Sequence, residues 1–108
     1  MSKKKIQKEV KKITNQIVKN YSPDKIFIFG SFVSGKFTSD SDVDFCIIKN
    51  TKKRKLDRIY EVYKLLRGRK IPVDVLVYTP KETKERLKLG DFFVEDIIKR
   101  GKLIYERK

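Results

Sequence analysis

The feature that most constrains the fold is a set of three short segments rich in Val, Ile and Phe. Segments of this length, with β-branched and aromatic residues, are typical of buried β-strands. They are residues 25–29, 42–48 and 71–78. The first stops at a glycine, and the other two carry aspartates among their apolar residues. Charged residues are rare in an apolar strand unless a partner compensates them. The sequence therefore predicts a small sheet that brings carboxylates together.

Amphipathic segments alternate with these strands. Apolar residues recur at helical spacing over residues 3–20 and again over residues 56–66. Residues 79–82 read Thr-Pro-Lys-Glu, a capping box with proline at the first helical position, which predicts a third helix. A last helix is expected between Asp91 and Gly101, followed by a short edge strand at residues 103–105. This order predicts one domain, residues 1–108, of the α/β (α+β) class, with helices packed on a small mixed sheet.

Composition excludes several kinds of chemistry. The chain has no histidine and one cysteine, Cys46, so catalytic triads, histidine–metal sites, cysteine-rich zinc sites and internal disulfides are ruled out. Catalysis would have to use carboxylates, hydroxyls, lysines and bound metal ions. The 28 Lys and Arg residues against 14 Asp and Glu leave a net charge of +14, which favours acidic partners. With no apolar run long enough for a membrane or a signal peptide, we expect a cytoplasmic protein.

Three aspartates are the candidate catalytic and metal-binding residues. Asp42 and Asp44 are two apart on a strand, so they share a face with their backbones roughly 7 Å apart. If Asp74 joins them, each like-charge pair at about 5 Å repels by about 3 kcal/mol at an effective dielectric of 20. Divalent cations with oxygen ligands would offset that repulsion. The simpler interpretations are a solvated loop for the first two and a lysine salt bridge for the third.

Gly30 and Ser31 follow the first strand directly. A glycine here lets the backbone approach a phosphate, and the serine hydroxyl and neighbouring amides can donate to its oxygens. Taken alone, the pair is also ordinary turn chemistry.

Together these residues resemble the polymerase-beta-type nucleotidyltransferase superfamily. The resemblance rests on Gly30-Ser31, ten intervening residues, Asp42-x-Asp44 and a carboxylate on a later strand, Asp74. The strings at residues 30–35 and 40–45 are close to those of its minimal nucleotidyltransferases, small domains of about this length. The resemblance implies a polymerase-beta-like fold, with Gly30 and Ser31 binding the nucleotide phosphates. It also implies that Asp42 and Asp44 bind two Mg²⁺ ions and that Asp74 completes the shell of the catalytic one.

The resemblance also implies a partner. Such proteins typically pair with a helical HEPN-type protein as antitoxin to its RNase toxin, and some transfer AMP from ATP to a tyrosine of the toxin. A hetero-oligomer is then expected, with no membrane contact. One departure is Ser34, where family members often have an arginine before the second glycine. Lys36 is a nearby substitute for that phosphate contact.

Two alternatives remain open. The acceptor could be a small molecule or a nucleic-acid end, with the missing wall of the acceptor pocket supplied by a second molecule. Alternatively, the chain could be a non-catalytic basic module that binds an acidic protein or RNA by charge alone, or that neutralises its partner by occlusion. The affinity of that module for its partner would fall steeply as the salt concentration rises and would not depend on the three aspartates. Its best support is the basic run at residues 52–55, which lacks the interleaved aromatics that stack on bases.

Overall fold

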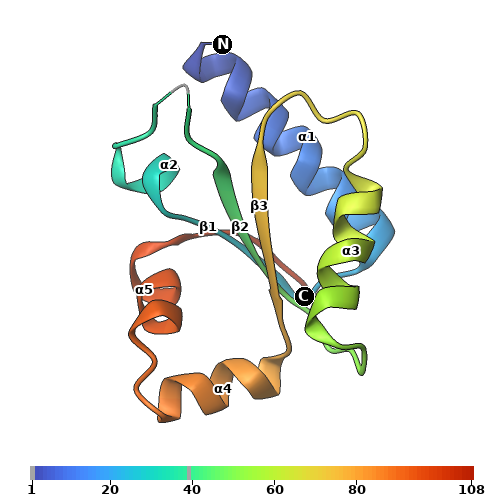
Figure 1. Cartoon of the computed structure of the whole chain (residues 1–108), viewed down its shortest axis with the longest axis vertical. Helices are drawn as coiled ribbons and strands as arrows, with labels where there is room; N and C mark the ends of the chain where they lie inside the picture. The colour runs from blue at the N-terminus through green and yellow to red at the C-terminus, as the bar shows by residue number, and fades with distance from the viewer. Residues whose placement is uncertain (1, 39) are drawn as a thin grey trace.

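The computed structural model describes residues 2–38 and 40–108 and contains one four-stranded sheet in the order β3-β2-β1-β4 (Figure 1). The strands are β1 (Lys25–Phe29), β2 (Val43–Ile48), β3 (Val73–Tyr78) and β4 (Lys102–Glu106). β1 pairs antiparallel with both β2 and β4, whereas β2 and β3 run parallel. The predicted mixed α/β architecture is confirmed.

Five helices connect the strands in the described part of the chain. They are α1 (Lys3–Tyr21), α2 (Ser31–Ser34), α3 (Lys55–Leu65), α4 (Pro80–Lys88) and α5 (Phe92–Arg100). Helices α1 and α3 lie within one residue of their predicted limits, and α4 and α5 begin where their capping residues predicted. Thr79 and Glu82 form the predicted capping box of α4. The side chain of Asp91 accepts hydrogen bonds from the first backbone amides of α5. The sequence did not predict α2, a single helical turn between β1 and β2.

The two faces of the sheet are covered unequally. Helices α1 and α3 lie on one face and form the main core, in which Ile13, Ile17 and Val62 are fully buried against the odd-numbered residues of β2 and β3. Burying each of these side chains contributes roughly 1.5–3 kcal/mol. On the opposite face, α5 packs Ile97 against Phe27 and Cys46 in a smaller cluster. We call this second side of the sheet the open face.

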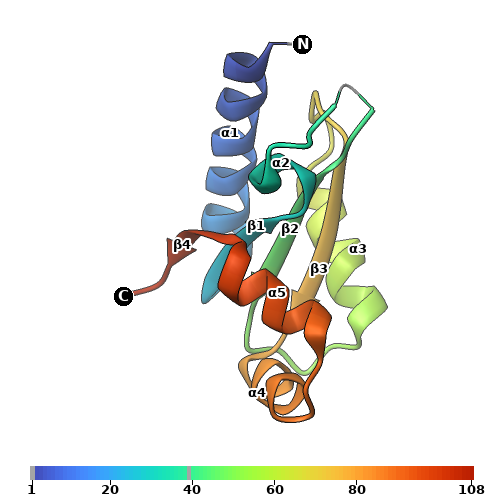
Figure 2. The same cartoon turned by 90° about the vertical axis from the view of Figure 1, so that its left-hand side faces the viewer.

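Only part of the open face is covered. Figure 2 shows α5 crossing it diagonally below the short α2 turn. The covered end includes Cys46, which is buried as predicted, and its burial raises the pKa of its thiol to about 12. Among residues 2–38 and 40–108, no long helix lies over the other end of the open face, where β1 ends and β2 and β3 begin. None of the described helices is long and apolar enough to cross a membrane.

Candidate active site

Asp44 and Asp74 lie side by side at this uncovered end. The parallel register pairs Asp44 of β2 with Asp74 of β3. Neighbouring strands are about 4.8 Å apart, and directly paired residues point to the same face, so both carboxylates lie on the open face. Asp42 directly precedes β2 and shares that side of the chain two residues away. The structure thus brings two of the three predicted carboxylates into register, with the third next to them.

The aspartates are less buried than the sequence indicated. Their apolar neighbours predicted burial, but Asp42 and Asp74 are exposed and Asp44 is half-buried. The prediction was wrong because the apolar residues of these strands point to the α1–α3 core, whereas the aspartates alternate onto the open face beyond the reach of α5. Their exposure leaves them accessible to a ligand from solvent.

Uncompensated negative charge collects at this site. Burial, the carboxylate of Asp74 and that of Asp42, in that order, raise the pKa of Asp44 above its ordinary value. Among the described residues, no ion pair includes any of the three aspartates, so the lysine salt bridge considered for Asp74 is absent there. Like charges gathered without a cation are a cost to the folded state, and a bound cation would relieve it.

Gly30 is required by the geometry around Asp44. Its backbone has φ +77° and ψ −150°, a region that essentially only glycine occupies. A Cβ atom on Gly30 would overlap Oδ2 of Asp44. The glycine therefore both makes the turn after β1 and leaves room for the carboxylate on the neighbouring strand.

Ser31 begins the α2 turn immediately after this glycine. The backbone amides of Val33 and Ser34 donate hydrogen bonds to the carbonyl oxygen of Gly30, at 3.1 and 3.0 Å, and these bonds close the turn. Ser31 is partly exposed, and α2 contacts both β1 and β2. Ser34 is exposed, and its hydroxyl donates weakly to the carbonyl of Ser31 at 3.4 Å. The turn therefore carries the predicted phosphate-binding residues to the edge of the aspartate site.

Tyr63 is a residue that sequence reasoning missed, since its helical spacing indicated only packing. Its hydroxyl donates to the carbonyl oxygen of Val73 and accepts from the amide of Val75, both at 3.2 Å. These backbone groups flank Asp74 on the free edge of β3. Burial, and then the charge of Asp74, raise the pKa of the Tyr63 hydroxyl. The hydroxyl occupies the position that a further strand would take and fixes the backbone that carries Asp74.

The donor set fits a hard divalent cation. Mg²⁺ is usually held by one or two carboxylates together with substrate phosphates. Asp44 and Asp74 supply that pair, and the space beside Gly30 is occupied by a carboxylate oxygen of Asp44. Within residues 2–38 and 40–108, no three acidic, histidine or cysteine side chains already converge on one point. A metal would therefore draw its further ligands from the nucleotide or from rotation of the exposed Asp42 side chain.

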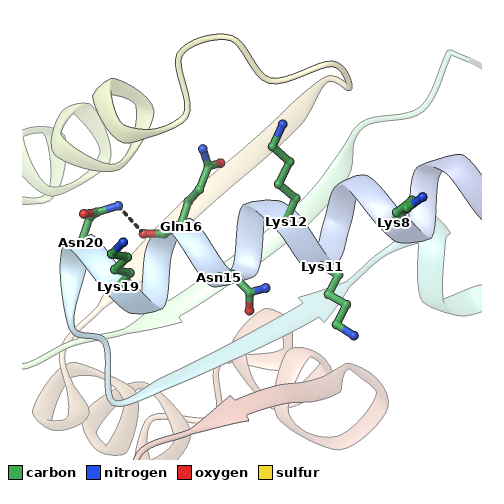
Figure 3. A pocket seen from close by; sticks show the side chains of 7 residues that line it. All are labelled: Lys8, Lys11, Lys12, Asn15, Gln16, Lys19 and Asn20. Atoms are coloured by element: carbon green, nitrogen blue, oxygen red, sulfur yellow. Dashed lines mark hydrogen bonds between the residues drawn. The ribbon is translucent and has the colours of Figure 1, made fainter.

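The basic surfaces lie elsewhere. Figure 3 shows an open hollow of about 480 Å³ along the outer side of α1, lined by lysine and amide side chains. Its lining residues are Lys8, Lys11, Lys12, Asn15, Gln16, Lys19 and Asn20. This helix covers the face opposite the aspartates. In the basic run at residues 52–55, Lys53 pairs with Glu61 and Arg54 with Asp57, so part of its charge is neutralised.

The comparisons with known proteins agree with this geometry. Over 99% of its length and 91% of the other chain, the structure resembles a crystal structure of a candidate nucleotidyltransferase from Sulfolobus solfataricus. The TM-score is 0.63 and the sequence identity is 24%, a likeness that concerns the fold. The fold is thus that of a nucleotidyltransferase, as predicted. A search of the curated proteins finds no match.

The family follows from the sequence itself. The family model described as "Nucleotidyltransferase domain" matches residues 7–104, which include the turn at Gly30 and all three aspartates. The chain belongs to this nucleotidyltransferase family, which implies a nucleoside triphosphate as substrate.

Proposed function

We propose that this chain is a Mg²⁺-dependent enzyme that transfers AMP from ATP to a tyrosine of a partner protein. In this proposal the partner is a HEPN-type RNase toxin, and the modification makes the chain its antitoxin. The observation that carries the catalytic part is the register of Asp44 with Asp74, directly beside a glycine without which the Asp44 carboxylate would not fit.

Each residue of the site has a role in this proposal. Gly30 and Ser31 bind the triphosphate, with the serine hydroxyl donating to a phosphate oxygen. Asp42, Asp44 and Asp74 would hold two Mg²⁺ ions, which would supply charge to neutralise the triphosphate and would lower the pKa of the acceptor hydroxyl. The acceptor oxygen bonds to the α-phosphorus while the bond to the bridging oxygen of pyrophosphate breaks. Asp74 accepts the tyrosine proton, since the chain has no histidine to do so.

The shape of the site supports a large acceptor. Asp42 and Asp74 are exposed on an uncovered end of the sheet, so a side chain carried by another protein can reach them. The net charge of +14 favours association with an acidic surface. A small-molecule acceptor would be better served by a closed pocket around the carboxylates.

The non-catalytic alternative is less well supported. A protein that acts by occlusion has no need for like charges in register, whose repulsion costs stability. Burial first, and then the carboxylates of Asp74 and Asp42, raise the pKa of Asp44, so part of that rise reflects the repulsion. Retaining such an arrangement is typical of a functional site.

The test is an intact-mass measurement of a helical partner protein encoded beside this chain. The partner is incubated with the chain, ATP and Mg²⁺, and compared with the Asp44→Asn and Asp40→Asn variants. Asp40 is an exposed carboxylate close in sequence and serves as the matched control for the loss of one charge. Added AMP with wild type and Asp40→Asn, but not with Asp44→Asn, supports the proposal. An unmodified partner that is nevertheless neutralised would contradict transfer and favour occlusion.

A further inference from the structure

An aromatic side chain of α5 borders the aspartate site. The ring of Phe93 packs edge-to-face on that of Phe29, with centroids 5.7 Å apart and an interplanar angle of 86°. Phe29 is the direct partner of Asp44 across the β1–β2 pair. Directly opposed residues of an antiparallel pair project to the same face with their Cα atoms about 5 Å apart. Phe29 therefore lies next to the Asp44 carboxylate, and the ring of Phe93 contacts that of Phe29.

Phe93 is not a core residue. It is 52% exposed, although it comes from the first turn of a helix whose Val94 and Ile97 are buried. An edge-to-face contact with one ring leaves much of a phenylalanine free for a second aromatic partner. The folded chain thus keeps an aromatic surface in solvent at the margin of its candidate active site.

Charge indicates which part of a nucleotide this surface suits. The side chain of Asp91 accepts from the amides of Phe93 and Val94 at 3.0 and 3.2 Å, so the first amides of α5 are already bonded. Asp91 also adds a negative charge at this end of the helix, at 3.9 Å from Arg86. A triphosphate is disfavoured there, whereas an uncharged base is not. The turn at Gly30 and Ser31 follows Phe29 directly at the end of β1, beside the Asp44 carboxylate where a metal-bound phosphate is proposed to lie.

We propose that Phe93, supported by Phe29, forms the base-stacking site, the aromatic surface on which the base of the nucleoside triphosphate stacks. This inference rests on the proposed function, because it takes the α-phosphate to lie at Asp44 and Asp74. Stacking on an aromatic ring tolerates every base, so Phe93 contributes affinity for the nucleoside without selecting adenine by hydrogen bonds. Phe92 is 84% exposed and has no described aromatic contact, which makes it the matched control.

The experiment is a pair of equilibrium titrations of the full chain in Mg²⁺ without an acceptor, one with ATP and one with inorganic tripolyphosphate. Phe93→Ala and Phe93→Leu should each weaken ATP binding by roughly tenfold, within the range measured for loss of base stacking. Neither should alter tripolyphosphate binding. Phe93→Trp should keep or improve ATP affinity, and Phe92→Ala should leave both ligands unaffected. Since Phe93→Leu keeps most of the apolar packing, it separates loss of the ring from any disturbance of α5.

The outcomes are distinguishable. Unchanged ATP affinity in both Phe93→Ala and Phe93→Leu would overturn the base-stacking site but not the proposed function. An equal loss of affinity for ATP and for tripolyphosphate would do the same. If the wild-type chain binds neither ligand, the proposed function and the base-stacking site are both contradicted. A Phe93→Ala variant that binds ATP normally but no longer modifies the partner would assign the ring to the acceptor and overturn its role with the base.

Discussion

Replacing Gly30 by alanine tests how closely the turn and the carboxylate depend on each other. The added methyl group would meet Oδ2 of Asp44, and the backbone at φ +77° and ψ −150° is one that alanine rarely adopts. The backbone strain alone costs about 1–3 kcal/mol. Relief of the overlap requires the carboxylate of Asp44 or the turn to move. A displacement of about 1 Å in a catalytic group can lower the rate by about 100-fold. We therefore expect Gly30→Ala to fold, with reduced stability and at least a 100-fold loss of transfer.

The control is Gly35→Ala, at the other end of α2. Gly35 also has a positive φ, +84°, but a Cβ atom there has nothing within 4 Å. Its substitution should cost about 1–2 kcal/mol of left-handed strain and leave the carboxylates undisturbed. Urea unfolding gives the stability of each variant, and the mass of the modified partner gives its activity.

A double-mutant cycle isolates the overlap itself. In an Asp44→Ala background the colliding oxygen is absent, so Gly30→Ala should cost less stability than it does in the wild type. The difference is the coupling between the two positions. Equal costs in both backgrounds, or full activity of Gly30→Ala, would refute the reasoning.

Three other predictions follow from single contacts. Because the pKa of Asp44 is raised on folding, its ionised form costs stability above that pKa, and the cost disappears below about pH 4, where the carboxyl is neutral in both states. Asp44→Asn should thus be more stable than wild type at pH 7 and equal to it near pH 3 in thermal unfolding, and a less stable variant at pH 7 would contradict this. Tyr63→Phe removes the hydroxyl that bridges two backbone groups of β3, so it should lower the free energy of unfolding in urea by about 1–2 kcal/mol and should also lower kcat. Tyr60→Phe is the control, because the ring of Tyr60 is exposed, and it should change neither quantity. Arg58 is buried and donates to Glu82 at 2.7 Å, so Arg58→Ala should cost about 3 kcal/mol in urea unfolding. Arg58→Met should cost less, because it also loses the ion pair but keeps the packing of the apolar stem. Equal losses in the two variants would contradict a contribution from that packing.

Local signals account for what the sequence predicted well. The capping box at Thr79, the aspartate before α5 and the glycines after α4 and α5 act within one turn, so they define helix ends without knowledge of the rest of the fold. The alternation of Val73, Val75 and Val77 with Asp74 likewise indicates which face the aspartate takes. For that reason the strands, the helices other than α2 and the grouping of the carboxylates could be predicted from the sequence pattern.

The contacts that could not be predicted are those between strands and helices distant in sequence. The overlap of Gly30 with Asp44 depends on the register of β1 with β2, and the bridge from Tyr63 depends on how α3 packs on β3. The exposure of the aspartates was misjudged for a similar reason, because it depends on how far α5 extends over the open face. No periodicity in the sequence encodes that distance.

The most direct test of the central claim asks which phosphate of ATP is transferred. The chain is incubated with Mg²⁺ and the helical partner in two parallel reactions, one with ATP labelled at the α-phosphate and one with ATP labelled at the γ-phosphate. Our account predicts that the partner gains only the α-label while labelled pyrophosphate is released from the γ-labelled ATP. Asp40→Asn should behave like wild type, and Asp44→Asn and Asp74→Asn should transfer nothing. Transfer of the γ-label, or α-labelling that survives both aspartate substitutions, would contradict the assignment of the Asp44–Asp74 pair as a nucleotidyl-transfer site.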